Sequence, residues 1–101
     1  DSIAIYILPN AAWARRVSGT FANSLASSHP HRAHAVLTGR SDEAYTVSIR
    51  APLDHPHSAD IVATHFPGGG GRAGAAGIDT LARDKLPALA DLLKRTYVYA
   101  P

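Results

Sequence analysis

The chain has 101 residues, of which ten are Lys or Arg and eight are Asp or Glu, so its formal net charge is +2. This length allows one domain with one modest core. The arginines are spread along the chain, so it has no basic block of the kind that binds nucleic acid by charge alone. The chain contains no cysteine, which excludes disulfides and thiolate metal sites, and no apolar run approaches the ~18 residues of a membrane span. We expect a cytoplasmic protein with no membrane partner.

The first third of the chain predicts a strand followed by a helix. Residues 3–8 form an apolar, β-branched run that is typical of a strand buried on both faces, and Pro9 ends it. Asn10 is suited to cap the helix that follows. Large apolar residues recur there at every fourth position and predict its apolar face: Trp13, Val17, Phe21 and Leu25.

The middle of the chain predicts a hairpin and a short helix. Residues 33–38 and 45–50 are typical of strands, and the second run alternates apolar with polar side chains. Residues 39–43 predict the turn between them. Ser58 is suited to cap a short helix that Pro67 stops.

The last third predicts a glycine-rich loop, a short strand over residues 75–78 and a helix. Four leucines at helical spacing mark that helix, with Lys94 and Arg95 at its favourable C-terminal end. We expect residues 1–101 to form one α/β domain, in which about three helices pack on a small mixed β-sheet. The expected order is β-α-β-β-α-loop-β-α.

The most informative stretch is the glycine run from Gly68 to Gly71, which Arg72 follows directly. Glycine lets a backbone approach another group closely, and successive exposed N–H groups form a concavity that binds anions. A guanidinium beside such a loop adds planar donors that suit phosphate. Because the run leads straight into an apolar strand, which a flexible linker rarely does, we expect a phosphate-binding loop.

Two known phosphate motifs do not fit this run. Gly69, Gly71 and Gly74 match the spacing of a dinucleotide-binding fingerprint, but that fingerprint needs a strand before it and a helix after it. Here a helix precedes and a strand follows, so we interpret the match as accidental. A P-loop needs a Lys-Ser or Lys-Thr pair after the glycines, and none stands there.

The six histidines and the single tryptophan raise two further hypotheses. The histidines lie mostly in proline-bearing turns without a carboxylate pattern, so we interpret them as surface residues and expect no metal ligands in this chain. Trp13 with Arg15 and Arg16 could stack on nucleic-acid bases. A core tryptophan beside solvated arginines is the more common arrangement.

These residues together resemble the C-terminal, DHH-associated domain of DHH-family phosphoesterases, over about residues 33–95. Residues 45–50 resemble that family's strand with its Ser-x-Arg element, here Ser48 and Arg50. Residues 59–66 resemble its short helix, and residues 68–77 resemble its glycine signature. Arg72 stands where the family has a histidine, and because arginine does not deprotonate in proteins, it is not expected to act as a general acid.

The resemblance implies an excised C-terminal module that binds substrate for a catalytic DHH domain of the same parent protein. That domain would hold divalent metals, typically manganese, so the parent is expected to be a metal-dependent phosphoesterase. This chain alone is expected to be no enzyme and to hold no cofactor. Its implied ligand is a phosphorylated nucleotide or a short single-stranded nucleic acid, bound by Ser48, Arg50, Gly68, Gly69, Gly70, Gly71 and Arg72.

Two alternatives fit the same residues. The glycine–arginine run is also similar to that of the C-terminal domain of alanyl-tRNA synthetases, a related module that contacts tRNA without catalysis. A docking or oligomerisation domain is the other alternative. In that case residues 3–8 would lie at a sheet edge and pair with a second copy, which gives a homodimer.

Overall fold

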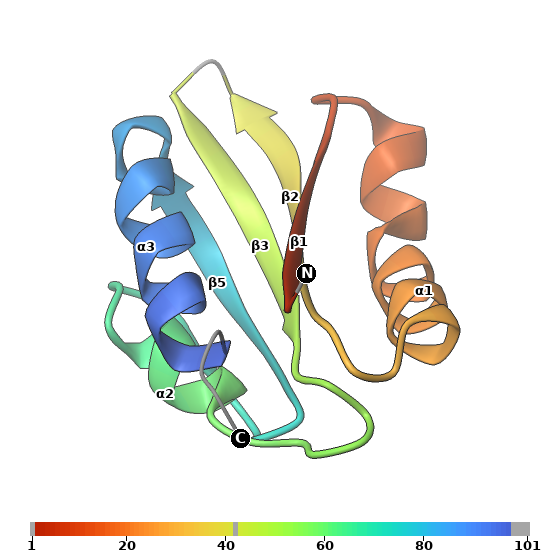
Figure 1. Cartoon of the computed structure of the whole chain (residues 1–101). Coiled ribbons are helices and arrows are strands. Elements are labelled where there is room, and N and C mark those ends of the chain that lie inside the picture. The colour runs from red at the N-terminus through yellow and green to blue at the C-terminus, as the bar shows by residue number, and fades with distance from the viewer. Residues whose placement is uncertain (1, 42, 98–101) are drawn as a thin grey trace.

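In the computed structural model, which describes residues 2–41 and 43–97, a five-stranded sheet carries helices on both faces (Figure 1). The strands are β1 (Ile3–Leu8), β2 (Ala33–Ser41), β3 (Ala44–Arg50), β4 (Gly69–Gly71) and β5 (Ala75–Ala82). The helices are α1 (Ala12–Ser28), α2 (Ala59–Thr64) and α3 (Leu86–Tyr97), and a 3-10 turn (Arg83–Lys85) precedes α3. The predicted fold class and element order are confirmed, with one difference: the glycine loop contains the short strand β4.

The strands lie in the order β1-β2-β3-β5-β4, so β1 and β4 are the two edges. β1 runs parallel to β2, and α1 makes the crossover between them. The other pairs, β2 with β3, β3 with β5 and β5 with β4, are antiparallel. The parallel pair needs the long crossover through α1, whereas short turns join the antiparallel pairs β2 with β3 and β4 with β5. The antiparallel pair β3 and β5 is joined through α2 and β4.

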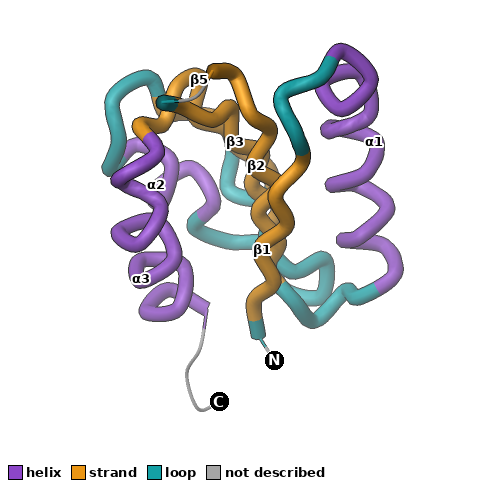
Figure 2. The backbone as a smooth tube through the Cα atoms, turned by 90° about the horizontal axis from the view of Figure 1, so that it is seen from above, coloured by secondary structure: helices purple, strands orange, loops and turns teal. Residues whose placement is uncertain are grey.

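The main core lies between the sheet and the helices α2 and α3. Figure 2 shows these helices on one side of the strands and α1 on the other. Tyr45, Val47 and Ile49 of β3 are buried there, which confirms the alternation predicted for this strand. Leu89 and Leu93 of α3 are almost fully buried against the same core, as their helical spacing predicted.

The predicted apolar face of α1 is wrong. The buried residues of α1 are Ala14, Ala22 and Ala26, whereas Trp13 and Val17 are 52% and 42% exposed. Small methyl groups let a helix lie close to a sheet, so the larger side chains are left on its outer flank. Phe21 keeps a contact, since its ring meets that of Tyr6 edge-on at 5.5 Å between centroids.

The strand β1 is also less buried than its apolar sequence predicts. It lies at the sheet edge, its residues are mostly half-buried, and Ile7 is 55% exposed. A strand at the edge of a sheet has only one neighbouring strand, so its side chains have fewer groups to pack against. The expectation of an edge position, made for the docking alternative, is confirmed.

Neither predicted helix cap forms. Ala11 occupies the N-cap of α1, and the Oδ1 of Asn10 instead accepts a hydrogen bond from Nη1 of Arg15. Ser58 stands at the N-cap of α2 with a positive φ of 68°, and its hydroxyl lies 2.9 Å from Nδ1 of His57. Among the residues described, no helix has both the length and the apolar character that crossing a membrane requires.

Candidate functional site

One half of the sheet remains uncovered on the side that faces α1. The helix packs against β2 and β3 there, and the side of that face formed by β5 and β4 lies open (Figures 1 and 2). The ladder places Ser48 beside Gly77 and Gly77 beside Gly70, while Arg50 pairs with Ala75. We call this surface the open face; its residues are Thr46, Ser48, Arg50, Gly70, Arg72, Ala75, Gly77 and Asp79.

Arg50 is anchored at one end of the open face. It ends β3, where strand alternation turns its side chain toward α1. Its Nε donates to Oδ1 of Asn23 on α1 at 2.8 Å, and its Nη1 donates to the carbonyl of Ile49 at 3.1 Å. Burial lowers the pKa of Arg50, and the nearby positive charge of Arg72 lowers it further. The two guanidinium groups therefore repel each other at this end of the face.

A pocket of about 380 Å³ brings these two arginines together. Arg50 comes from β3 and Arg72 from the turn between β4 and β5, while Asn23 and Ser27 of α1 form the opposite wall. None of its described lining residues is acidic. The pocket thus offers two positive charges and several polar groups to a ligand, which favours an anion. We call it the arginine pocket.

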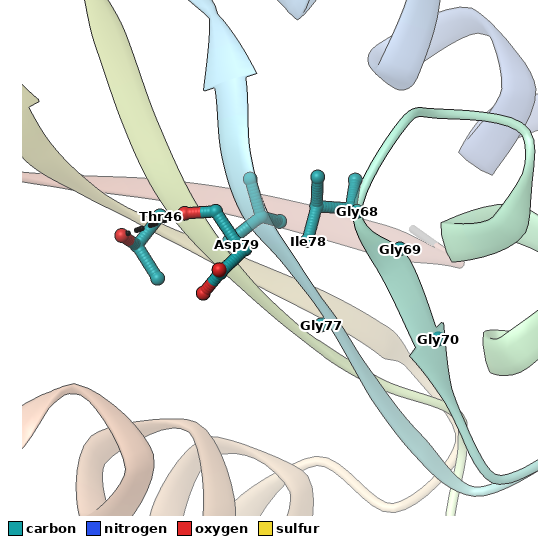
Figure 3. A pocket seen from close by; sticks show the side chains of 8 residues that line it. Thr46, Gly68, Gly69, Gly70, Gly77, Ile78 and Asp79 are labelled. Carbon is teal, nitrogen blue, oxygen red and sulfur yellow. Dashed lines mark hydrogen bonds between the residues drawn. The ribbon is translucent and has the colours of Figure 1, made fainter.

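A second pocket, of about 340 Å³, lies along the glycines at the other end of the open face (Figure 3). Gly68, Gly69 and Gly70 line it from one side, and Thr46 and Asp79 from the other. The Oγ1 of Thr46 donates to the carbonyl oxygen of Asp79 at 3.1 Å. Because the carboxylate of Asp79 is the charged group among its described lining residues, this pocket is less suited to phosphate than the arginine pocket.

The glycine run is an edge strand rather than an open loop. The N–H of Gly69 donates to the carbonyl of Phe66 at 3.1 Å, and the N–H of Arg72 donates to the carbonyl of Ala75 at 2.8 Å. Gly70 pairs with Gly77 in the ladder. The amides of Gly69 and Arg72 therefore stabilise the turn and the hairpin, and they do not contribute to a concavity of free N–H groups.

Most of the glycines in the run have a structural reason to be glycine. A Cβ at Gly69 would lie 1.7 Å from the carbonyl oxygen of Ala63, so glycine is needed where β4 passes α2. Gly71 has a φ of +142°, which side chains rarely allow. Gly70 has neither constraint, because nothing lies within 4 Å of its Cβ position. The space beside Gly70 is therefore available to a ligand.

The structure gathers part of the predicted site on one surface. Ser48, Arg50, Gly70 and Arg72 lie on the open face, while Gly68 and Gly69 line its far pocket. Gly71 lines neither of these two pockets. Sequence reasoning missed Asn23, which anchors Arg50, because an isolated asparagine inside a helix carries no recognisable signal.

Arg40 is a second residue that sequence reasoning missed. It lies in the part of β2 assigned to a turn, and its Nη1 donates to the carbonyl of Asp79 at 2.9 Å. That contact spans β3, so it places a third positive charge beside the glycine end of the open face. Only the register between β2, β3 and β5 brings it there.

The histidines do not form a metal site in the described part of the chain, where no three His, Asp or Glu side chains lie close enough to hold a metal ion. One of them corrects the expectation of surface histidines, because His34 of β2 is only 1% exposed beneath α1. Burial, together with the charge of Arg32 and the neighbouring His29, lowers the pKa of His34 to about 4.

No protein-family profile matches this chain, and no curated protein sequence matches it. A solved structure does: the C-Ala domain from Aquifex aeolicus alanyl-tRNA synthetase, with a TM-score of 0.73 over 96% of this chain and 91% of that chain, at 19% sequence identity. The two share a fold. This finding overturns the resemblance to DHH-family phosphoesterases, and the catalytic partner domain and manganese implied by it lose their basis.

The physical reason for the error lies in the glycines. The signature that suggested phosphoesterases is built from residues that this hairpin needs for itself, at Gly69 against α2 and at Gly71 with its positive φ. The glycines at these two positions are therefore explained by the packing and backbone of this hairpin, and they are no evidence for a phosphoesterase.

Proposed function

We propose that this chain is a non-catalytic RNA-binding module, and that its open face holds the phosphate backbone of the RNA. Its fold is that of the C-Ala domain of an alanyl-tRNA synthetase, an enzyme that by its name acts on tRNA. That likeness motivates RNA as the partner, and the open face supplies residues suited to bind it.

The observation that carries the proposal is the proximity of Arg50 and Arg72. Besides burial, the positive charge of Arg72 lowers the pKa of Arg50, which means that the two groups repel each other in this pocket. No acidic residue lines the described walls of the pocket. A phosphate group between the two arginines would relieve the repulsion and accept hydrogen bonds from both guanidinium groups. Repulsion between the two guanidinium groups does not stabilise the fold, so their proximity supports a role in binding an anion.

The bare backbone beside the arginine pocket suits a polymeric ligand. Gly70 and Gly77 lie next to each other on two strands, and nothing lies within 4 Å of the Cβ position of Gly70. Ser48 follows in the same row of the ladder. A nucleic-acid backbone that starts in the arginine pocket can therefore approach the sheet closely at Gly70 and Gly77, where Ser48 offers a hydrogen bond.

The test is binding of a tRNA transcript, measured by fluorescence anisotropy at fixed salt. We expect a Kd of roughly 10⁻⁴ to 10⁻⁶ M, the usual range for binding dominated by phosphate contacts. Arg50→Gln and Arg72→Gln should each weaken binding about 10-fold or more, since hydrogen bonds to charged groups contribute about 1.5–3 kcal/mol.

The matched control is Arg95→Gln. Arg95 lies on α3, on the opposite face of the sheet, in an exposed ion pair with Asp91 at 2.9 Å. The Arg95→Gln substitution removes one positive charge, as the other two substitutions do, but it lies away from the open face. It should therefore leave the Kd unchanged. Equal losses from all three variants would mean that only net charge matters, and unchanged binding by the Arg50 and Arg72 variants would exclude the open face as the RNA site.

The docking alternative is supported by the edge position of β1. Its outer edge has no strand partner among the described residues, and Ile7 of this strand is exposed. Such an edge can pair with another copy. Sedimentation over a range of protein concentrations decides this: a dimer supports pairing through β1, and a monomer at every concentration excludes it.

A further inference from the structure

The outer flank of α1 carries a pocket that the proposed phosphate site does not use. Its volume is about 410 Å³, and it lies between the helix and the end of β1. Its walls are largely apolar, and a guanidinium and two hydroxyl groups lie among them. The lining residues are Leu8, Trp13, Arg16, Val17, Thr20, Phe21 and Ser24.

Trp13 is unusual in this pocket because it is a large aromatic residue that is 52% exposed. Leu8 and Val17 line the pocket together with this half-exposed ring. Arg16, one helical turn further along, lines the same pocket. A flat ring beside a positive charge is the combination that binds a nucleobase together with its phosphate.

The charge of the helix favours the same kind of ligand. Every residue of α1 is described, and its sequence contains Arg15 and Arg16 but no acidic residue. Nothing on this helix would therefore repel a phosphate, whereas an acidic rim would be expected around a pocket for a basic partner.

The pocket also lies on the side of α1 that carries Asn23, the residue that anchors Arg50. Arg16 lines the pocket beside Trp13, and Asn23 lines the arginine pocket. These two residues are seven positions apart, so they lie on the same side of the helix. A strand whose phosphate occupies the arginine pocket can thus cross α1 between Asn23 and Arg16.

We infer that Trp13 stacks on an unpaired base of the RNA, and that Arg16 contacts the phosphate of that nucleotide. The inference rests on the proposed function and adds a base-binding subsite to it. A fully paired RNA cannot fill this subsite, so the chain should prefer RNA that has unpaired bases beside the phosphates bound by Arg50 and Arg72.

Trp13 is the single tryptophan of the chain, so tryptophan emission, excited at a wavelength that the four tyrosines do not absorb, reports on this pocket. The test titrates the full chain with an oligoadenylate and with an abasic strand of equal length, and follows Trp13 emission and strand anisotropy together. We expect saturable quenching with oligoadenylate only. The abasic strand carries the same phosphates, so it should bind more weakly and leave the emission unchanged.

Variants then separate stacking from folding. Trp13→Ala should weaken oligoadenylate binding about 5- to 100-fold, whereas Trp13→Phe should retain most of the affinity because a ring remains. Ile61→Ala is the matched control, since Ile61 is 58% exposed on α2 beyond the opposite face of the sheet. Circular dichroism should give the same spectrum for all of these variants.

The outcomes distinguish this inference from the function on which it rests. Oligoadenylate binding that depends on Arg50 and Arg72 but leaves Trp13 emission unchanged overturns the base subsite alone. An absence of RNA binding in the anisotropy measurement overturns the proposed function itself. A change in Trp13 emission with protein concentration, accompanied by a dimer that Trp13→Ala abolishes, shows a protein contact instead and overturns the subsite.

Discussion

Arg50 of β3 and Asn23 of α1 are joined by a hydrogen bond of 2.8 Å between Nε and Oδ1, across 27 positions of sequence. This contact ties the helix to the open face of the sheet and fixes the plane of the guanidinium. The hydrogen-bond acceptors of this guanidinium among the described residues are Asn23 and the carbonyl of Ile49, and neither is a carboxylate. Asn23 thus holds the guanidinium of Arg50 in position without neutralising its positive charge.

The contact between Asn23 and Arg50 can be tested by two substitutions with different expected results. Asn23→Ala removes the acceptor and should weaken RNA binding about 2- to 10-fold, because a net hydrogen bond contributes about 0.5–1.5 kcal/mol. Asn23→Asp keeps the acceptor but adds a negative charge beside Arg50, so it should abolish most of the binding without lowering stability. Anisotropy and urea denaturation measure the two effects. Stronger RNA binding by Asn23→Asp would contradict the assignment of phosphate to this pocket.

Salt dependence gives a count of the phosphates that the chain binds. The logarithm of the binding constant should fall linearly with the logarithm of salt concentration, and each phosphate contact should add roughly 0.7 to 0.9 to the slope. Arg72→Gln should reduce the slope by about one contact. Arg95→Gln, whose residue is paired with Asp91 on α3, should leave it unchanged. A slope near zero for the unmodified chain would exclude phosphate binding altogether.

The same substitution at two neighbouring glycines should have different effects on the stability of the fold. Gly69→Ala places a methyl group against the carbonyl of Ala63 and should destabilise the fold by about 3 kcal/mol. Gly70→Ala meets open space and should change the free energy of unfolding by no more than about 1 kcal/mol. If RNA lies across β4, Gly70→Ala should nevertheless weaken binding, because its methyl group occupies the ligand's space. Urea denaturation and anisotropy of both variants provide the measurement.

The buried His34 should make the stability of the chain depend on pH. Its pKa is about 4 in the folded chain and near 6.5 when unfolded, so the unfolded state takes up the proton first. The contribution is fully present above about pH 6.5 and is lost as the pH falls toward 4, by about 3 kcal/mol in all. The charges that oppose protonation come from Arg32, His29 and His31.

The corresponding measurement compares unfolding free energies from pH 7 to pH 4 for three proteins. His34→Leu should lose this part of the pH dependence. His65→Leu, which removes an exposed histidine at the end of α2, should retain it. A profile for His34→Leu that is parallel to that of the unmodified chain would show that the loss of stability comes from other groups.

The fold could be predicted wherever one local pattern determined the structure. The alternation of residues 45–50 and the leucine spacing around Leu89 and Leu93 each match a period that only one element has, and both elements formed as expected. The face of α1 could not be predicted, because Trp13 and Val17 have the right spacing for a core face. The decisive factor was the close approach of Ala22 and Ala26 to the sheet, which is a tertiary effect.

The site could be predicted only as a set of separate residues. Arg50 and Arg72 are 22 positions apart, and what brings them together is the register of β3 with β5 and of β5 with β4. No local pattern encodes that register. The strand β4 was missed for a related reason, since glycine is disfavoured in strands and is present here because α2 leaves no room for a side chain at Gly69.

The three buried alanines of α1 act as spacers. Ala14, Ala22 and Ala26 are at most 4% exposed, so their methyl groups set how far the helix stands from the sheet. That distance also sets the width of the arginine pocket, because Asn23 and Ser27 on its wall belong to the same rigid helix. Ala22 is not among the described residues that line that pocket, so a larger side chain at this position would widen the pocket without touching a ligand. Specificity in this fold can therefore change through residues that lie entirely inside the protein.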